Sequence, residues 1–316
     1  YRATEQWFCS VDAIKDAAVK SCDSIQWKPE WGKERMISMI SERNDWCISR
    51  QRVWGVPIPI FYCDDCGADI VTPETIAHVA ALFREHGSNV WFDREPRDLL
   101  PEGFVCPKCG KAHFSKETDI MDVWFDSGST WAAVAAERPY LKYPADLYLE
   151  GGDQYRGWFQ SSMLTSIAVN GVAPYHQIAT HGWTVDGEGK AMHKSLGNAV
   201  APDEVIKEYG ADMLRLWVAS ADYTQDMRIS KEIMKQLSQA YLKIRNTARY
   251  MLGNLCDFDP NADAVAVEKL MDLDRYALHA FNELVKTVRA AYDRYEFHGV
   301  YRAVYNFCVV DMSNFY

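Results

Sequence analysis

The sequence has 316 residues, 48% of them apolar and 25% charged, and its formal net charge at pH 7 is −10. This length allows more than one hydrophobic core. The acidic balance argues against a protein that is basic over its whole surface, so an anionic partner would have to meet a local basic patch. No apolar run approaches the roughly 20 residues of a membrane-spanning helix, and the N-terminus lacks the layout of a signal peptide.

Residues 1–60 combine short strand-like runs with a helix near Lys33–Ile40. The Val56–Pro59 segment should be extended, because each proline restricts itself and its neighbour. The stretch "WCISRQRVWGVPIP" places Arg50 and Arg52 two residues apart, so on a strand they would share one face. They could bind a phosphate backbone or pair with acidic side chains.

Residues 61–117 have the composition of a small inserted module with one helix, Pro73–His86. Two CxxC pairs supply four thiols, Cys63, Cys66, Cys106 and Cys109. Zn²⁺ favours a tetrahedron of four thiolates, which leaves no open position for chemistry, so the spacing predicts a structural zinc site. The alternatives are coincidence and a redox-active disulfide pair. The other five cysteines are single and mostly in apolar surroundings, which indicates reduced thiols and a cytoplasmic location.

Residues 118–230 have an α/β pattern. A strand at Ala145–Gly151 precedes a helix that ends at Gly171, and a second strand at 176–185 precedes a helix from Pro202 to Gly210. This alternation predicts a parallel sheet, in which ligands bind at the carboxyl ends of the strands. A glycine turn with the sequence GGDQ and the loop "GEGKAMHKSLGN" follow these two strands.

Three motifs in this region have two interpretations each. In "LEGGDQYRGWF", Asp153 could cap a helix or accept hydrogen bonds from ribose hydroxyls. In "DVWFDSGSTW", Trp124 lies between Asp122 and Asp126 and could belong to the core or to an apolar pocket. The loop "GEGKAMHKSLGN" could be a solvated surface loop or a phosphate-handling loop, and its place after a parallel strand favours the second.

From about residue 231 onward the pattern is helical. Apolar residues recur at spacings of three and four, and arginines lie on the opposite face. The basic face could contact the stem of an RNA or could simply be solvated. The chain begins without methionine in a strand-like run at Tyr1 and stops within a helix-like pattern at Tyr316, so we expect a fragment of a longer protein.

In this order, "WCISRQRVWGVPIP", "DVWFDSGSTW", "YLEGGDQYRGWF" and "KAMHKSLGN" resemble blocks of the class I aminoacyl-tRNA synthetases, and most closely the isoleucyl branch. The resemblance covers essentially the whole chain. It implies an α/β fold: the second half of a Rossmann-like catalytic domain with a small zinc-binding insertion, followed by an α-helical bundle. The implied domains are a catalytic segment (1–60), a zinc module (61–117), the second half of the nucleotide-binding domain (118–230) and the start of a helical anticodon-binding domain (231–316).

On this resemblance the loop corresponds to the family's KMSKS loop, which grips the phosphates of ATP. Lys194 and Ser195 match the motif's second lysine and final serine, whereas Ala191 and His193 replace its usual first lysine and serine. Lys190 is then expected to supply the missing charge. The resemblance also implies that the adenylate and ATP are bound by Glu150, Gly151, Asp153, Gln154 and Lys194. It further implies that Trp124 and Trp158 line the pocket for the amino-acid side chain.

The implied activity is ATP-dependent formation of isoleucyl-adenylate and transfer of isoleucine to its tRNA, with Mg²⁺ accompanying ATP, in a full-length protein that is monomeric. The family's HIGH block is absent, because no His-x-Gly-His occurs in the sequence, and an editing insertion would precede Tyr1. We therefore expect this chain to be inactive by itself. The alternatives are a valyl- or leucyl-type synthetase and a non-catalytic tRNA-binding or zinc scaffold.

Overall fold

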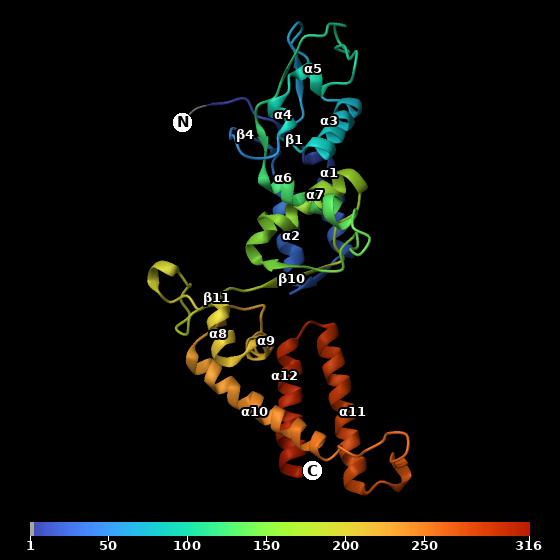
Figure 1. Ribbon diagram of the computed structural model, residues 1–316, viewed down its shortest axis with the longest axis vertical. Helices are drawn as coiled ribbons and strands as arrows, with labels where there is room; N and C mark the ends of the chain where they lie inside the picture. Colours follow the sequence, from blue (N-terminus) through green and yellow to red (C-terminus); the bar gives the residue numbers. More distant parts are fainter. Residues whose placement is uncertain (1–2) are drawn as a thin grey trace. The chain divides into compact units, whose positions relative to one another are not determined.

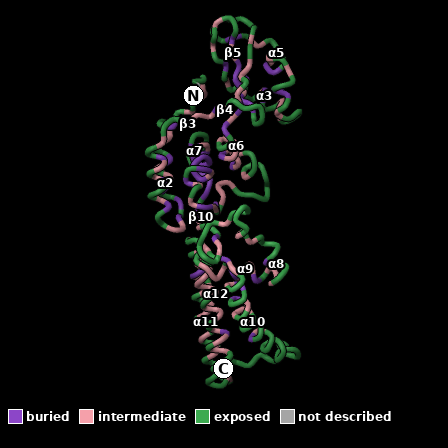
Figure 2. The backbone as a smooth tube through the Cα atoms, turned by 90° about the vertical axis from the view of Figure 1, so that its left-hand side faces the viewer, coloured by how far each residue is buried: buried purple, intermediate pink, exposed green. Residues whose placement is uncertain are grey.

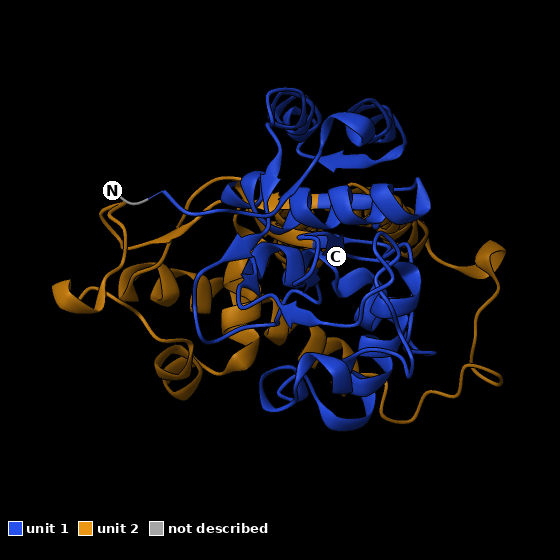
Figure 3. Cartoon of the chain, turned by 90° about the horizontal axis from the view of Figure 1, so that it is seen from above, with its two compact units in different colours: residues 1–148, 153–178 blue, residues 149–152, 179–316 orange. Residues whose placement is uncertain are grey.

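The computed structural model describes residues 3–316 and divides into two compact units (Figures 1 and 3). Unit 1 comprises the chain up to Tyr148 together with Asp153–Ile178, and unit 2 comprises Leu149–Gly152 and Ala179–Tyr316. Tyr1, where the sequence predicts a strand, lies outside the described residues.

Unit 1 alternates short strands with helices on either side of the cysteine module. Its first part contains β1 (Phe8–Cys9), α1 (Asp12–Ser21), a 3₁₀ turn (Cys22–Ser24), β2 (Gln26–Lys28), α2 (Trp31–Ser41), β3 (Trp46–Cys47) and β4 (Ser49–Arg50). After the module come β8 (Ile120–Met121), α6 (Val123–Gly128), a π-helical turn (Trp131–Ala135), β9 (Tyr148–Gly151), a 3₁₀ helix (Gly152–Arg156), α7 (Trp158–Asn170) and β10 (Gln177–His181). Of these, β9 and β10 belong to unit 1 only in part. The helix predicted near Lys33–Ile40 is confirmed as α2.

The parallel arrangement predicted for the strands at 145–151 and 176–185 is confirmed just before β9 and β10, where Ala145 and Tyr175 form a parallel bridge. The strand order is β2-β10-β9, and the boundary between the two units falls within β9 and β10. The second predicted strand is divided: β10 ends at His181, and β11 (Thr184–Val185) follows a break at Gly182 and Trp183. An added Cβ at Gly182 would lie 2.3 Å from the backbone of Gln225, so this close approach requires glycine.

Helix α7 is buried on nearly all sides (Figure 2), which suits a helix at the centre of a core. It ends as the sequence predicts, with Gly171 in the left-handed region at φ 70°. The stretch "DQYRGWF" that follows β9 is not yet part of this helix up to Arg156. Residues 152–156 form a 3₁₀ helix instead, and α7 begins only at Trp158.

Helix α6 packs against α7 through a glycine. The Cβ that an alanine would add at Gly128 would lie 2.8 Å from the carbonyl carbon of Ser161. Thr165 holds the same contact by donating from its hydroxyl to the carbonyl oxygen of Gly128 at 2.7 Å. The two helices are therefore as close as a residue without a side chain allows.

The cysteine module forms its own small core. Its strands β5 (Phe61–Cys63), β6 (Asp69–Ile70) and β7 (Phe114–Lys116) pair antiparallel in the order β6-β5-β7. Its helices are α3 (Pro73–His86), α4 (Val90–Asp93) and α5 (Pro96–Leu99). The range predicted for α3 is confirmed, and Thr72 caps it in a reciprocal arrangement with Thr75. Phe61 and Trp91 are fully buried at the centre of this core.

Unit 2 contains a parallel pair of strands, β11 and β12 (Met227–Arg228), and a series of helices. The helices are α8 (Pro202–Tyr209), α9 (Ala211–Ser220), α10 (Lys231–Gly253), a 3₁₀ turn (Val267–Lys269), α11 (Asp272–Asp293), α12 (Phe297–Asn306) and a final π-helical segment (Phe307–Phe315). The predicted limits of α8 are confirmed, with Pro202 at its start and Gly210 after its end. Trp217 and Met234 lie in the core of this unit.

The packing at Gly128 has a testable consequence. Gly128→Ala should lower the free energy of unfolding of the chain by about 1–3 kcal/mol, because the methyl group meets backbone atoms that cannot rotate away. Chemical denaturation measures this difference. The control is Gly253→Ala at the end of α10, where an added Cβ meets nothing within 4 Å and no loss of stability is expected. Equal stability of the wild type and Gly128→Ala would contradict this account of the contact.

Candidate functional site

The four cysteines of the two CxxC pairs converge on one point. Their sulfur atoms all lie within 4.8 Å of one another. The Sγ atoms of Cys63 and Cys109 are 3.5 Å apart, and those of Cys66 and Cys106 are 3.7 Å apart. Four thiolates about 2.3 Å from a central zinc ion would be separated by about 3.8 Å, so these residues fit a tetrahedral metal site. All four thiols are free, which does not support the alternative of a disulfide pair.

The two CxxC turns have the same backbone form. The N–H of Gly67 donates to the carbonyl oxygen of Cys63, and that of Gly110 donates to Cys106, both at 2.8 Å. Both glycines have a positive φ, 65° and 71°, which a side chain would strain. Burial acts to raise the pKa of the Cys106 thiol, but backbone N–H donors overcome it and lower that pKa to about 7.

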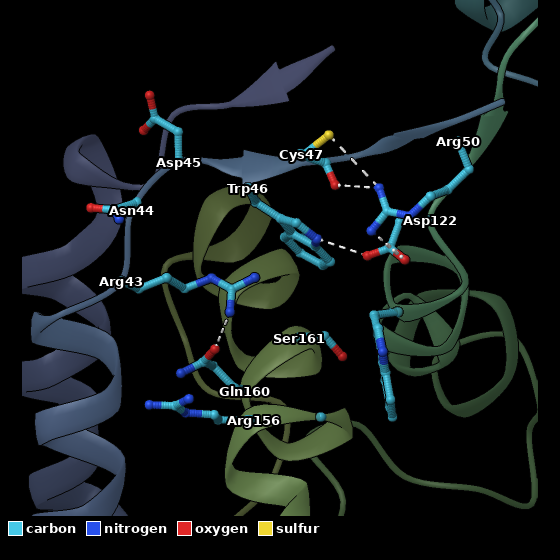
Figure 4. A pocket seen from close by; sticks show the side chains of 12 residues that line it. Arg43, Asn44, Asp45, Trp46, Cys47, Arg50, Asp122, Arg156, Gln160 and Ser161 are labelled. Atoms are coloured by element: carbon cyan, nitrogen blue, oxygen red, sulfur yellow. Dashed lines mark hydrogen bonds and ion pairs between the residues drawn. The ribbon is translucent and has the colours of Figure 1, made fainter. Parts of the chain in front are cut away.

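A buried carboxylate joins two of the sequence blocks (Figure 4). Asp122 accepts a hydrogen bond from Nε1 of Trp46 at 2.9 Å and pairs with Nη2 of Arg50 at 3.0 Å. Strand β4 pairs antiparallel with β8, which brings Arg50 opposite Ile120. Of the two interpretations of Arg50, pairing with an acid is the one observed. The prediction that Arg50 and Arg52 share a strand face is wrong, because β4 ends at Arg50 and the exposed Arg52 lies in the following loop.

The two tryptophans predicted for an amino-acid pocket lie on adjoining elements of unit 1. Trp124 on α6 is 41% exposed, and an added Cβ at Gly157 would lie 3.0 Å from its ring. Trp158, which follows Gly157 in the sequence, stacks on Tyr148 with the ring centroids 4.0 Å apart. Its Nε1 donates to the carbonyl oxygen of Ser127 at 3.0 Å. Trp158 is therefore fixed, whereas Trp124 keeps an open face.

The second acid of this block has an unusual environment. Burial, and then the negative charge of Asp122, raise the pKa of Asp126 to about 6. Asp122 itself is compensated by Arg50 and Trp46. The pKa of Asp126 therefore lies closer to neutral pH than that of an ordinary aspartate, which the sequence pattern does not reveal.

The glycine turn after β9 leaves its acidic residue at the surface. The backbone N–H that opens α7, on Trp158, donates to Oε1 of Gln154 at 2.9 Å, so Gln154 caps the helix. The capping role considered for Asp153 is not observed. Asp153 is exposed and accepts a hydrogen bond from Nε2 of its neighbour Gln154 at 2.9 Å. Glu150 and Gly151 are the last residues of β9.

The loop at 187–198 has a fixed frame. Oδ1 of Asp186 accepts from the backbone N–H of Glu188 at 3.0 Å and of Lys190 at 2.8 Å, and its Oδ2 accepts from Nδ2 of Asn198 at 2.8 Å. Asn198 also accepts from the N–H of His193 at 2.9 Å. The hydrogen bond from Asn198, followed by that from the Lys190 N–H, lowers the pKa of Asp186.

The side chains on this frame point to solvent. Lys194 and Ser195 lie on a 3₁₀ turn (Lys194–Leu196) and are exposed, as is His193. Lys190 pairs with Glu188 at 2.7 Å, with both side chains at least 70% exposed. Within residues 3–316, Lys194 forms no ion pair. The four residues predicted from the loop motif, Lys190, His193, Lys194 and Ser195, therefore all lie in this one exposed segment.

Four residues that hold these segments together were not predicted from the sequence, namely Asp186, Asn198, Arg43 and Gln160. Asp186 was detectable in principle, because an aspartate before "GEGK" is typical of a side-chain-stabilised turn. Arg43 and Gln160 gave no local signal, since the Arg43 guanidinium donates to a Gln160 oxygen across 117 residues of sequence.

Comparison with known proteins places these features in a family. The family of class I tRNA synthetases (I, L, M and V) matches residues 1–230, and the anticodon-binding domain of tRNA ligases matches residues 274–316. An isoleucine–tRNA ligase of Caldicellulosiruptor saccharolyticus is 57% identical over 316 residues, and one of Caldanaerobacter subterraneus subsp. tengcongensis is 58% identical. The matches cover this whole chain but only 34% of each relative.

Solved structures agree on the fold. The LeuRS of Agrobacterium radiobacter K84, in a ternary complex, has a TM-score of 0.63 at 23% identity over 89% of this chain and 39% of its own. A methionyl-tRNA synthetase of Mycobacterium tuberculosis has a TM-score of 0.66 at 20% identity over 97% and 51%. No helix among the described residues is long and apolar enough to cross a membrane. From the matches in sequence and in fold, the chain belongs to the class I tRNA synthetases.

Proposed function

We propose that this chain is part of an isoleucine–tRNA ligase that forms isoleucyl-adenylate from isoleucine and ATP and transfers isoleucine to its tRNA. The observation that carries this proposal is identity of 55–58% to proteins of that name across all 316 residues. The alternatives, a valyl- or leucyl-type enzyme or a non-catalytic scaffold, lack such support. Since the chain spans about a third of these relatives, the activity is proposed for the full-length protein.

We assign the phosphates of ATP to the loop at 187–198. Amino-acid activation needs positioning and neutralisation of negative charge on the departing pyrophosphate more than covalent chemistry. Lys194 has no ion-pair partner among residues 3–316 and is the first candidate for this contact, with Ser195 next to it on the turn and His193 just before it. Among the described residues, the ammonium group of Lys190 is bound only by an exposed pair with Glu188, a kind of interaction that contributes little and is readily exchanged.

The adenosine and the amino acid are assigned to the blocks around β9 and α6. Glu150, Gly151, Asp153 and Gln154 would hold the adenylate, and the exposed Asp153 carboxylate can accept hydrogen bonds from ribose hydroxyls. Trp124 and Trp158 would wall the isoleucine side chain, the first with its open face and the second held against Tyr148.

For the remaining parts we propose the division into a catalytic segment (1–60), a zinc module (61–117), the second half of the nucleotide-binding domain (118–230) and an anticodon-side helical domain (231–316). Zn²⁺ bound by the four cysteines would be structural, because no coordination position remains open. ATP would act together with Mg²⁺. Free thiols support a cytoplasmic location, and we propose a monomeric full-length enzyme.

The assignment of the loop is tested by alanine variants of a full-length synthetase that contains this chain. Lys194→Ala should reduce isoleucine-dependent ATP–pyrophosphate exchange by about 100-fold or more, as expected when a transition state loses one preorganised charge. Lys190→Ala should reduce it by about 10-fold, because that residue supplies the second charge.

The control for both is Lys207→Ala on α8, which removes an exposed lysine of the same unit outside the loop and should leave exchange unchanged. Unchanged exchange in Lys190→Ala would refute the role of that lysine. Exchange that depends on valine or leucine rather than isoleucine would refute the proposed specificity.

The zinc assignment predicts about one zinc ion per chain by elemental analysis of the purified protein. Cys66→Ser and Cys106→Ser should each lose the metal and lower the thermal unfolding temperature, because the core of the module surrounds the thiols. Cys256→Ser is the matched control, since Cys256 is exposed and outside the cluster. A metal-free protein with oxidised cysteines at these positions would instead support a disulfide pair.

A further inference from the structure

Unit 1 contains a cavity of about 370 Å³ whose charged side chains the assignments above do not use. It lies between the segment before β3, the start of α6 and the start of α7 (Figure 4). Trp124 belongs to its lining. Its charged lining consists of Arg43, Arg50, Arg156, Asp45 and Asp122.

The positive charges of this cavity are only partly compensated. Asp122 is occupied by Arg50 and by the indole of Trp46. Asp45 is exposed and accepts a hydrogen bond from the backbone N–H of Val11 at 3.2 Å. In the part of the chain that the structure describes, neither Arg43 nor Arg156 has an ion-pair partner. Two guanidinium groups therefore line the cavity without an anion of their own.

Arg43 is held in place but incompletely bonded. Its guanidinium donates to Oε1 of Gln160 and stacks over the ring of Trp46 at 5.2 Å. Its Nε is buried and has no hydrogen-bond partner among the described residues. Burial lowers the pKa of Arg43, which the charge of Asp122 only partly opposes. A buried donor without an acceptor is costly, so this arrangement is suited to an acceptor that arrives with a ligand.

Arg156 adds a second, exposed charge beside this fixed one. It lies at the end of the 3₁₀ helix that precedes α7 and has no ion-pair partner among residues 3–316. Gln160 and Ser161 line the same cavity one turn further along the chain. Guanidinium groups bind phosphate through paired N–H donors, and both arginines offer such donors here.

We propose that Arg43 and Arg156 bind a backbone phosphate at the single-stranded 3′ end of the tRNA, which makes them positioning residues for the transfer step. The inference rests on the proposed function and deepens it. The cavity adjoins the open face of Trp124, to which the amino acid is assigned. The RNA end that receives the acyl group must reach that place, whereas the phosphates of ATP are assigned to the loop at 187–198.

The test uses a full-length synthetase with Arg43→Gln, Arg43→Lys or Arg156→Gln. In Arg43→Gln and Arg156→Gln the KM for tRNA in aminoacylation should rise about 10-fold, with ATP–pyrophosphate exchange within about 2-fold of wild type, because only binding of the RNA is weakened. The salt dependence of tRNA binding should also weaken. The negative slope of log K for tRNA binding against log salt concentration should become smaller in magnitude, by about 0.7 for each single-strand phosphate that the variant no longer neutralises. Arg43→Lys, which keeps the charge, should retain the wild-type slope.

Arg97→Gln on α5 is the control, since it removes an exposed arginine outside the cavity and should change neither quantity. An unchanged tRNA KM and salt slope in both glutamine variants would overturn the proposal. An equal loss of exchange and aminoacylation would also overturn it, because the cavity would then serve ATP, isoleucine or another segment of the protein. A wild-type enzyme without isoleucine-dependent exchange would instead refute the proposed function, independently of these variants.

Discussion

The buried carboxylate of Asp122 is the group on which the arrangement of unit 1 depends. It joins Trp46 and Arg50 on one segment to the start of α6, 76 residues away from Trp46 in the sequence. A carboxylate removed from water is unfavourable unless its oxygens are bonded, so both partners are required at once. Satisfying this one group therefore fixes β4 against β8 and sets the position of α6.

The position of α6 in turn determines what Trp124 can do. Gly128 lets α6 approach the backbone of α7, so that the ring of Trp124 lies over Gly157 while part of its face stays open. Trp158, which follows Gly157 in the sequence, is immobilised by Tyr148 and by a hydrogen bond to Ser127. A fixed ring beside a partly exposed one suits the apolar amino-acid pocket proposed for these two tryptophans.

The loop at 187–198 in unit 2 is held in a different way. Its conformation is fixed by hydrogen bonds between its backbone and two polar side chains rather than by burial. Asp186 and Asn198 accept and donate enough hydrogen bonds to define the loop while its lysines remain in water. In the phosphate role proposed for the loop, such a frame would present its cations to a polyanion, since Lys194 has no ion-pair partner among residues 3–316. Preorganisation of this kind lowers the cost of binding.

Local sequence patterns were sufficient to define several elements and the blocks of the candidate sites. The limits of α3 and α8 and the end of α7 follow from proline, glycine and capping residues, whose effects act within a few bonds. The four thiols were identifiable because each CxxC turn positions two sulfurs locally. The folded chain was needed to learn that Arg50 is bound to Asp122, that Gln154 rather than Asp153 caps α7, and that Arg43 meets Gln160 across 117 residues. These outcomes depend on burial and charge compensation between distant segments, which no local pattern encodes.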